Sequence, residues 1–269
     1  MLLATVTNDK YFFNAVNLID SYKFKSFNQE VLFYALDLSD KYKELLKHRY
    51  GSQVIVEDVS RDCDHSHDLA TFFYKVSAIK SAMQKGCDFI YSDATNEIVK
   101  FTSDLKTDAD RMGGRIILPY NVEMLKNKYW TTNICFEKMG CDSQEYRESM
   151  QHWAGLQVYL ATEGNRLMIE EMYQCMLDIN IAGPRVGVKK PDGDTSPCIE
   201  HRCDQSVLSI LLKKHNMVNS FDFNMAHKYG DQQTLVDFDR SYKPNLDDMV
   251  IFSRKTKFND YSSRLKELQ

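Results

Sequence analysis

The sequence predicts an α/β protein with a mostly parallel, twisted sheet flanked by helices. The first observation is that short apolar runs alternate with amphipathic segments of helical length in the N-terminal third of the chain. The second is the order of these segments, β-α-β-α-β-α-β, which favours right-handed crossovers between parallel strands. The third is the length of the chain. A chain of 269 residues is long enough for one large α/β domain, which can bury most of its apolar surface without disulfides.

Seven alternating elements are predicted in the regular first part of the chain. In order they are strand Leu2–Thr7, helix Tyr11–Tyr22, strand Val31–Leu36, helix Ser39–Arg49, strand Val54–Val59, helix Thr71–Lys85 and a strand that ends at Asp93. The last helix carries Phe72, Val76, Ile79 and Met83 on one stripe, and Gly86 follows it as a suitable C-terminal cap. The sequence of residues 2–93 therefore predicts four parallel strands joined by three helices.

The second half of the chain is less regular. We predict two strands and three helices there, at Arg115–Tyr120, Asn133–Phe136, Ser143–Trp153, Asn165–Leu177 and Asp204–His215 respectively. Residues 182–198 form a loop rich in glycine and proline. Because no repeat, low-complexity tract or composition break occurs, we expect a single domain over residues 1–269, regular up to about residue 100 and irregular from 101 to 269.

Composition narrows the class of protein. The formal net charge is −4, so no broad positive field favours nucleic acid as a partner. The seven cysteines are scattered and odd in number, which predicts reduced thiols and a cytoplasmic or other reducing compartment. The N-terminus lacks the features of a signal peptide, and no stretch approaches the ~20 apolar residues of a membrane span. We therefore expect a soluble chain.

The segment after the first strand, residues 7–11 (TNDKY), contains no glycine. A dinucleotide-binding turn needs glycines so that the backbone can approach the pyrophosphate, and no glycine-bounded P-loop occurs either. Side chains must therefore hold any nucleotide. Asp93 ends a buried apolar strand, and ligands of open α/β sheets bind at such strand ends, so we expect Asp93 to face a cleft.

Short motifs between Leu2 and Leu212 carry a family resemblance. They are ATVTN at 4–8 with Tyr11, LIDS at 18–21, YKV at 74–76, FIYSDAT at 89–95 and HRCDQS at 201–206. Together they resemble nucleotide-sugar glycosyltransferases of the GT-A fold, nearest in pattern to the glycogenin and bacterial lipopolysaccharide galactosyltransferase type. The resemblance implies a hexosyl- or pentosyltransferase that moves a sugar from a UDP- or GDP-sugar donor to a hydroxyl of a glycan acceptor. It also implies that residues 1–100 bind the nucleotide and residues 101–269 the acceptor.

The resemblance assigns five residues to the nucleotide-sugar donor. Thr5, Thr7 and Asn8 would hydrogen-bond the base and ribose, Tyr11 would stack on them, and Lys75 would lie near the donor sugar. The threonines, Asn8 and Lys75 also have an ordinary structural explanation. Thr and Asn commonly end strands or cap helices, and Lys commonly lies on a solvated helix face.

A divalent metal is the cofactor that the resemblance implies. In this family the strand ends in Asp-x-Asp, whose carboxylates bind Mn²⁺ or Mg²⁺ and, through the metal, the donor diphosphate. Here Asp93 is followed by Thr95 at the second position, and a hydroxyl is a poorer ligand than a carboxylate. The resemblance adds His227 as a later metal ligand and Lys228 as a contact of the diphosphate. The sequence leaves the metal requirement open.

Asp204 and Gln205 are the predicted catalytic residues, at the start of a strongly apolar helix. In the resembling family this pair lies beside the reacting anomeric carbon. For an inverting transfer Asp204 would remove the acceptor hydroxyl proton, and for a retaining transfer Asp204 or Gln205 would stabilise a cationic sugar. Asp is also a favoured N-cap residue, which is the ordinary explanation of its position.

Two further groups of residues are candidates for the acceptor site or for a metal site. Residues 153–159, which begin with Trp153, are expected to form a wall for the acceptor sugar, with Asn133 in the same cleft. A zinc site could in principle use residues of two cysteine- and histidine-containing loops, namely Cys63, His65, His67, Cys198, His201 and Cys203. Their spacings do not match paired zinc knuckles, so we do not expect structural zinc.

Two other functions remain open from the sequence. A sugar nucleotidyltransferase can use a similar sheet, but the first strand lacks a glycine-rich phosphate loop. A non-catalytic protein that binds carbohydrate or nucleotide sugar is consistent with Thr95 in place of the second carboxylate.

Overall fold

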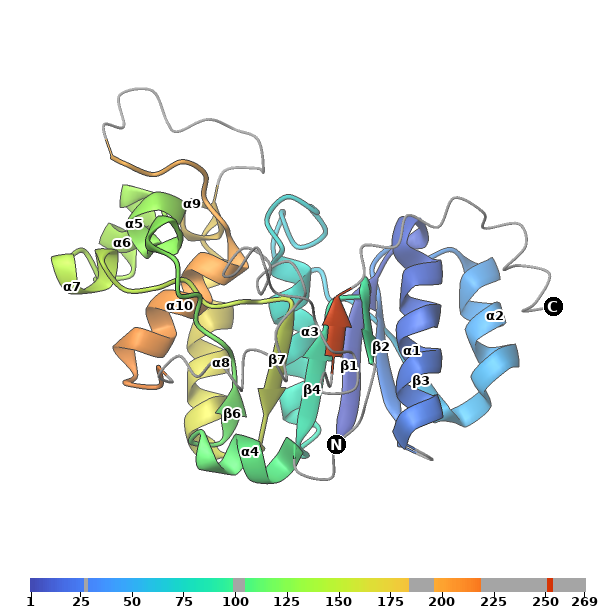
Figure 1. Cartoon of the computed structure of the whole chain (residues 1–269). Coiled ribbons are helices and arrows are strands. Elements are labelled where there is room, and N and C mark those ends of the chain that lie inside the picture. The colour runs from blue at the N-terminus through green and yellow to red at the C-terminus, as the bar shows by residue number, and fades with distance from the viewer. Residues whose placement is uncertain (27–28, 99–104, 184–195, 219–250, 254–269) are drawn as a thin grey trace, which may run out of the picture.

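The computed structural model describes residues 1–26, 29–98, 105–183, 196–218 and 251–253 (Figure 1). Six strands form one sheet in the order β3-β2-β1-β4-β7-β6. Their bounds are β1 Leu2–Thr7, β2 Val31–Ala35, β3 Val54–Asp58, β4 Phe89–Ser92, β6 Arg115–Ile116 and β7 Leu156–Tyr159. Strands β1 to β4 pair in parallel, whereas β7 is antiparallel to both of its neighbours. The predicted mostly parallel α/β fold is confirmed.

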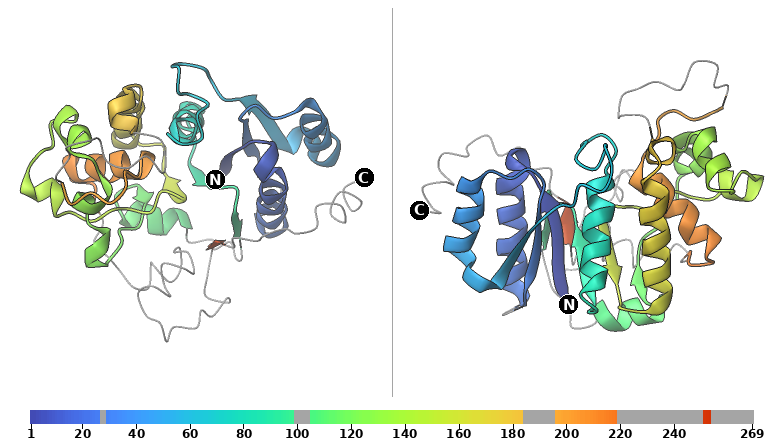
Figure 2. Two further views of the ribbon diagram at one scale, coloured as in Figure 1. Left: turned by 90° about the horizontal axis from the view of Figure 1, so that it is seen from above. Right: turned by 180° about the vertical axis from the view of Figure 1, so that it is seen from behind.

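Helices cover both faces of the sheet, and the alternation of side chains along the strands explains why. Along β2, Val31, Phe33 and Ala35 pack into one apolar cluster, and Leu32 and Tyr34 pack into the other. The first cluster includes residues of α1, α2 and α4, and the second includes residues of α3, α8 and α10. Seen from behind, α3 and α8 stand side by side over one face (Figure 2). The bounds of these helices are α1 Phe12–Ser26, α2 Asp40–Tyr50, α3 Phe73–Gln84, α4 Leu105–Arg111, α8 Glu163–Met176 and α10 Asp204–Lys214.

The direction of the strand order reverses between β1 and β4. The chain leaves β1 towards β2 and β3 and then returns to the other side of β1 as β4. Connections diverge where the strand order reverses, and open α/β sheets bind ligands at that point. Because β1 and β4 are parallel, their last residues, Thr7 and Ser92, lie at the same edge of the sheet.

Short elements complete the described part of the chain. They are η1 Asp9–Tyr11, η2 Gly51–Gln53, β5 Asn96–Ile98, η3 Glu123–Leu125, α5 Asn127–Trp130, α6 Asn133–Lys138, α7 Gln144–Arg147, α9 Ile179–Ala182 and β8 Ile251–Ser253. Strands β5 and β8 pair antiparallel in a separate two-stranded sheet. The seven elements predicted before residue 93 all occur, with ends shifted by a few residues, and the predicted helices at 165–177 and 204–215 are confirmed as α8 and α10.

The predicted strand Asn133–Phe136 is wrong, because these residues begin helix α6. A four-residue apolar run has no periodicity that separates a strand from a helix. In the structure Cys135, Phe136 and Met139 are buried. Their spacing of i, i+1 and i+4 lies on one face of a helix, which packs into the core.

The predicted helix Ser143–Trp153 is largely wrong. Helix α7 ends at Arg147, and the chain then extends and makes isolated antiparallel bridges through Met150 and His152. These bridges join residues distant in sequence, so tertiary pairing overrides the local helical pattern.

The sheet also differs from the prediction at its far edge. Strand β7 is missing from the prediction because a run of four residues is too short to show a strand period, and in the structure all four are buried. The predicted strand Arg115–Tyr120 forms sheet pairs only through its first two residues, as β6. The local sequence pattern therefore predicts the helices and strands of the irregular half poorly.

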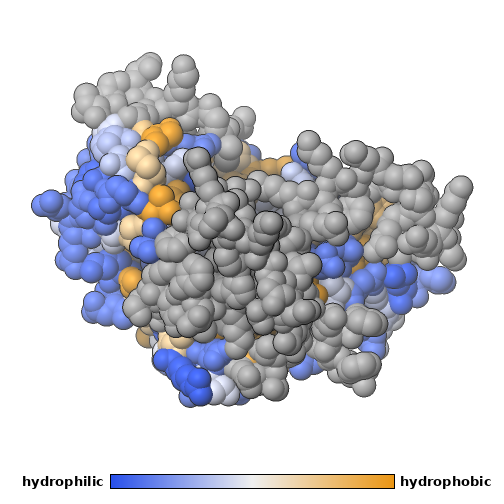
Figure 3. All heavy atoms as spheres, in the orientation of Figure 1, coloured by the Kyte–Doolittle hydropathy of each residue, from blue (hydrophilic) through white to orange (hydrophobic). Residues whose placement is uncertain are grey.

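Figure 3 shows one face of the molecule coloured by hydropathy. Hydrophilic residues gather at the left edge of this face, over the helical lobe, and apolar residues lie beside them. Within the described ranges, no helix has both the length and the apolar character needed to cross a bilayer.

Candidate active site

Lys75 is the centre of the candidate site. It lies in the first turn of α3 and is only 5% exposed, so the ordinary explanation as a solvated lysine is wrong. Its ammonium Nζ lies 3.2 Å from Asp93 Oδ1 and 2.9 Å from Asp204 Oδ2, and it donates to the carbonyl oxygen of Ala154 at 3.4 Å. We call Lys75, Asp93 and Asp204 the charged cluster. One buried cation thus joins the end of β4, the start of α10 and the segment before β7.

Asp93 lies in a turn directly after β4. Its backbone N–H donates to Gly155 O at 2.9 Å, and its carbonyl oxygen accepts from Asn96 N–H at 3.0 Å. The Tyr91 hydroxyl donates to Asp93 Oδ1 at 3.2 Å, and burial together with the Asp93 charge raises the pKa of Tyr91 well above its ordinary value. The Asp93 side chain remains 38% exposed, so a ligand in the crevice can reach it.

Two residues that the sequence did not single out hold this turn. The side-chain amide of Asn96 is buried and donates to Ser92 Oγ and to Gly155 O, both at 2.9 Å. Gly155 leaves room for its neighbours, because a Cβ atom there would lie 2.8 Å from Trp153 Nε1 and 3.1 Å from Asp93 Oδ2. Trp153 therefore lies beside the Asp93 turn, and its role as part of a wall for the acceptor sugar stays a prediction.

Asp204 begins helix α10 and is 4% exposed. Burial would lower the pKa of the Lys75 ammonium, but the carboxylates of Asp204 and Asp93 outweigh burial and hold that pKa above its usual range. Burial raises the pKa of Asp204, Lys75 offsets this only in part, and Asp93 adds to it. The charged cluster therefore holds a firmly protonated lysine beside a carboxyl group that takes up a proton more readily than an exposed aspartate.

Backbone strain lies on both sides of the charged cluster. Phe72, just before α3, has φ 57°, and Cys203, just before Asp204, has φ 45° and ψ −115°. Neither is glycine, and such conformations cost about 1–3 kcal/mol each and tend to occur at functional sites. The Cys203 thiol donates to Ala70 O at 3.2 Å, which ties the start of α10 to the loop before α3.

Gln205 follows Asp204 and belongs to a chain of neutral side chains. Its Nε2 donates to Gln151 Oε1 at 2.8 Å, and Gln151 Nε2 donates to Asn127 Oδ1 at 2.7 Å. We call Gln205, Gln151 and Asn127 the amide chain. Gln151 and Asn127 are completely buried, whereas Gln205 is partly exposed beside Asp204.

Comparison with solved structures identifies the fold. Two crystal structures of the galactosyltransferase LgtC, one of an active-site mutant and one with donor and acceptor sugar analogues, align with TM-scores of 0.54 and 0.51 at 11% and 12% identity, over 100% of this chain and 95% of LgtC. Mouse xyloside xylosyltransferase 1 aligns with a TM-score of 0.53 at 12% identity, over 94% of this chain and 96% of its own. The bifunctional glycosyltransferase WbbM gives 0.57 at 9% identity, over 96% of this chain and 46% of WbbM. This chain has the GT-A fold.

Sequence comparisons add nothing to the structural ones. No protein-family model matches this GT-A chain, and no curated protein matches it either. The similarity to solved structures therefore shows the fold alone. The chemistry follows from the residues of the site itself.

The residues predicted to bind the nucleotide lie at the end of β1, but they differ in accessibility. Thr5 is completely buried and its hydroxyl donates to Ser92 O at 2.8 Å, so it ties β1 to β4. Thr7 is 4% exposed and donates to Asn8 O at 3.3 Å. Asn8 Oδ1 is buried without a hydrogen-bond partner in the described structure, and Tyr11 is 39% exposed. Tyr11 is therefore the member of this set that is open to a ligand, and Asn8 Oδ1 is a buried acceptor that the described residues leave unsatisfied.

The described residues of this GT-A site do not fit a divalent metal by themselves. Asp93 contributes one carboxylate, whose Oδ1 is already paired with the Lys75 ammonium. Thr95 offers only a hydroxyl in the turn after it, and no group of three or more His, Cys, Asp or Glu side chains within the described ranges is arranged to hold a metal ion. His227 and Lys228 lie outside the described residues.

The cysteine and histidine loops do not form a zinc site in the described structure. His65 Nε2 hydrogen-bonds Met176 O at 2.8 Å, and His201 Nε2 hydrogen-bonds Ile181 O at 3.0 Å. None of the seven cysteines, all of which lie in the described ranges, forms a disulfide. These side chains are therefore engaged in packing and in hydrogen bonds to the backbone.

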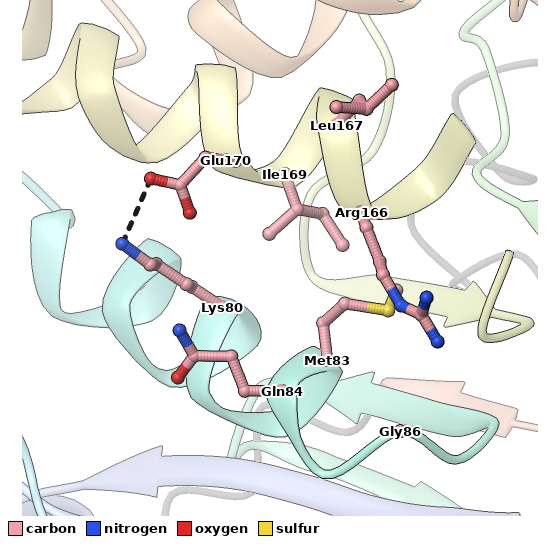
Figure 4. Close-up of a pocket in the computed structure, with 8 residues that line it drawn as sticks. All are labelled: Lys80, Met83, Gln84, Gly86, Arg166, Leu167, Ile169 and Glu170. Atoms are coloured by element: carbon pink, nitrogen blue, oxygen red, sulfur yellow. Dashed lines mark hydrogen bonds and ion pairs between the residues drawn. The ribbon is translucent and has the colours of Figure 1, made fainter. Parts of the chain in front are cut away.

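A surface cavity of about 390 Å³ lies elsewhere, between α3 and α8 (Figure 4). Lys80 and Glu170 form an ion pair at 3.1 Å there, beside Met83 and Ile169. Lys80 is five residues beyond Lys75 and so lies on a different side of α3. None of the predicted site residues lines this cavity, which is separate from the charged cluster.

Proposed function

We propose that this protein is a glycosyltransferase that moves a sugar from a nucleotide-diphosphate donor to a hydroxyl of a glycan acceptor. The observation that carries the proposal is the charged cluster, in which a buried Lys75 joins Asp93 and Asp204 at the edge where β1 and β4 end. Buried charges are costly to desolvate and need a structural or chemical reason to be retained. The GT-A fold supports this assignment, since solved galactosyl- and xylosyltransferases share it.

For the donor, we propose that the nucleotide lies against the end of β1 and the sugar against Asp93. Asn8 Oδ1 has no hydrogen-bond partner in the described structure, and we propose that the side chain turns towards the donor so that Oδ1 accepts from an N–H of the base. The exposed ring of Tyr11 can stack on the base or ribose. The exposed part of the Asp93 carboxylate can accept from the sugar hydroxyls, while Lys75 limits the negative charge near the diphosphate.

For the transfer, we propose that Asp204 and Gln205 act at the anomeric carbon. The bond from that carbon to the diphosphate oxygen breaks, a bond to the acceptor oxygen forms, and the acceptor hydroxyl loses its proton. Positive charge develops on the sugar ring, and the Asp204 carboxylate and the Gln205 carbonyl oxygen place negative charge beside it. In an inverting transfer Asp204 would also take the acceptor proton.

A non-catalytic binder is the second candidate, and one observation favours it. The position of the second metal-binding carboxylate is Thr95, and the remaining carboxylate is engaged by Lys75. Such a protein would bind the nucleotide sugar and would not turn it over.

One experiment separates the two candidates. The protein is incubated with UDP-, GDP- and ADP-sugars, with and without Mn²⁺, and the thermal shift and the slow hydrolysis of each donor are measured. The transferase proposal expects a shift and hydrolysis with at least one donor. A shift without hydrolysis indicates a binder, and no shift with any donor contradicts both candidates.

A further inference from the structure

The amide chain has a direction, and that direction is fixed at its far end. Asn127 Nδ2 donates to Ser149 Oγ at 2.8 Å and to the backbone carbonyl oxygen of Tyr146 at 3.4 Å. A carbonyl oxygen can only accept, so the NH₂ group of Asn127 must face Tyr146 and its Oδ1 must face the other way. This orientation does not depend on how the amide of Asn127 itself is assigned.

The direction passes from Asn127 to Gln205 one amide at a time. Because Asn127 Oδ1 accepts, Gln151 must present its NH₂ group to Asn127, at 2.7 Å. Gln151 Oε1 therefore faces Gln205, which must in turn donate through Nε2, at 2.8 Å. The Gln151 NH₂ group also donates to Thr131 Oγ1 at 3.4 Å, a hydroxyl that can accept in this orientation.

Burial keeps this arrangement in place. Asn127, Thr131 and Gln151 are all 0% exposed, so a reversed amide would face a like group without water to compensate. The chain also starts close to α10, because Ser209 Oγ, four residues after Gln205, donates to Gln205 O at 2.6 Å and accepts from His152 N–H at 2.8 Å. The segment that carries Gln151 is thus fixed to the helix that carries Gln205.

We propose that Gln151 is a positioning residue that makes Gln205 present its carbonyl oxygen, and not its NH₂ group, to the cleft. This inference rests on the proposed transferase function. With Nε2 committed to Gln151, the Oε1 of Gln205 accepts no hydrogen bond from the described residues and carries the negative end of the amide dipole. That end stabilises positive charge on the donor sugar, whereas a reversed amide would oppose it.

The test compares Gln151→Met with Asn165→Leu. The first variant keeps the volume but removes the three side-chain hydrogen bonds of Gln151, so Gln205 becomes free to rotate. The second removes an equally buried amide that bonds Gly114 O and Leu160 O at the far end of the sheet. Hydrolysis is measured with the panel donor that the wild-type protein hydrolyses fastest. We expect Gln151→Met to lower kcat by about 10- to 100-fold with KM nearly unchanged, and Asn165→Leu to lower Tm without a comparable loss in kcat.

A double-mutant cycle distinguishes positioning from general damage. In a Gln205→Ala background, Gln151→Met should lower kcat no further, because the group that it orients is absent. Equal losses in both backgrounds, or no loss in the wild-type background, would overturn the inference. Failure of the wild-type protein to hydrolyse any donor would instead count against the proposed function.

A readout independent of turnover is the side-chain amide signal of Gln205 in a ¹⁵N–¹H NMR spectrum, assigned by its loss in Gln205→Ala. In the wild-type protein this NH₂ group should exchange slowly and resonate away from free glutamine. In Gln151→Met the signal should move to the chemical shift of free glutamine, and its NH₂ protons should exchange quickly with water. An unchanged signal would overturn the inference even if activity falls.

Discussion

The charged cluster and the amide chain meet at the start of α10, and they are held together by different forces. The charged cluster joins β4, α3 and α10 through one lysine and two carboxylates. The amide chain joins α10 to α5 and to the segment between α7 and β7 through neutral groups that are 0% exposed at Gln151 and Asn127. One side of the site therefore depends on charge and the other on the direction of hydrogen bonds.

The difference predicts how each side responds to change. Removing one member of a buried ion pair leaves an uncompensated charge, which destabilises the fold and alters the binding of anionic ligands. Reversing a neutral amide changes no net charge, so its effect falls on the orientation of one group. The following variants and conditions test whether this contrast holds.

The largest effect is expected from Lys75→Met. It leaves the buried carboxylate of Asp204 facing Asp93 without a cation, and breaking a buried pair in this way costs about 3–5 kcal/mol. The free energy of unfolding is measured by urea titration. The matched control is Lys80→Met on the same helix, whose pair with the 48% exposed Glu170 side chain is worth about 0–1 kcal/mol. Equal losses in the two variants would contradict the buried ion-pair description.

The irregular half should respond to acid, because it holds two histidines that must stay neutral. Burial lowers the pKa of His152 to about 4 and that of His201 to about 4, against 6.5 in an unfolded chain. Below pH 6.5 the unfolded chain therefore binds more protons than the folded one, and stability falls with falling pH, by about 3 kcal/mol per histidine at pH 4.

This pH dependence is checked by urea titrations between pH 7 and pH 4. The variants His152→Gln and His201→Gln should each reduce the slope of stability against pH by one proton, and the double variant by two. A slope that the variants leave unchanged would show that other groups cause the acid sensitivity.

A smaller effect is expected from Gly155→Ala. The added Cβ would meet Trp153 Nε1 at 2.8 Å and Asp93 Oδ2 at 3.1 Å, and overpacking of this kind costs about 1–3 kcal/mol. Because the clash displaces the Asp93 carboxylate, the donor-induced thermal shift should weaken as well. The control is Gly164→Ala in α8, where the contact at 3.2 Å is the flexible end of Met217. A full donor shift in Gly155→Ala would indicate that the Asp93 carboxylate is not used in binding.

The sequence predicts the charged side of the site better than the neutral side. Asp93 follows a strand, and Asp204 begins a helix whose apolar pattern is clear, so both could be placed from local signals. Parallel strands and the helices that follow them bring such residues to one edge of the sheet. Only the family resemblance places Lys75 near the donor sugar, and no pattern in the sequence predicts that its side chain is buried.

The neutral side could not be predicted, because its contacts join distant, irregular segments. Gln151 lies 24 residues from Asn127 and 54 residues from Gln205, in the part of the predicted helix 143–153 that is not helical in the structure. Asn96 and Gly155 hold the Asp93 turn through a contact 59 residues apart in sequence. A single glutamine or asparagine carries no local signal of burial, so only tertiary structure reveals these roles.

The central claim is that the charged cluster binds a nucleotide sugar, with Asp93 serving binding and Asp204 serving transfer. The most direct measurement is the donor affinity and the donor hydrolysis rate of Asp93→Ala and Asp204→Asn, taken side by side with the wild-type protein. We predict that Asp93→Ala loses donor binding, whereas Asp204→Asn keeps its affinity and loses about 100-fold in hydrolysis. Equal loss of affinity in both variants would contradict this division of roles, and unchanged affinity and rate in both would contradict the site itself.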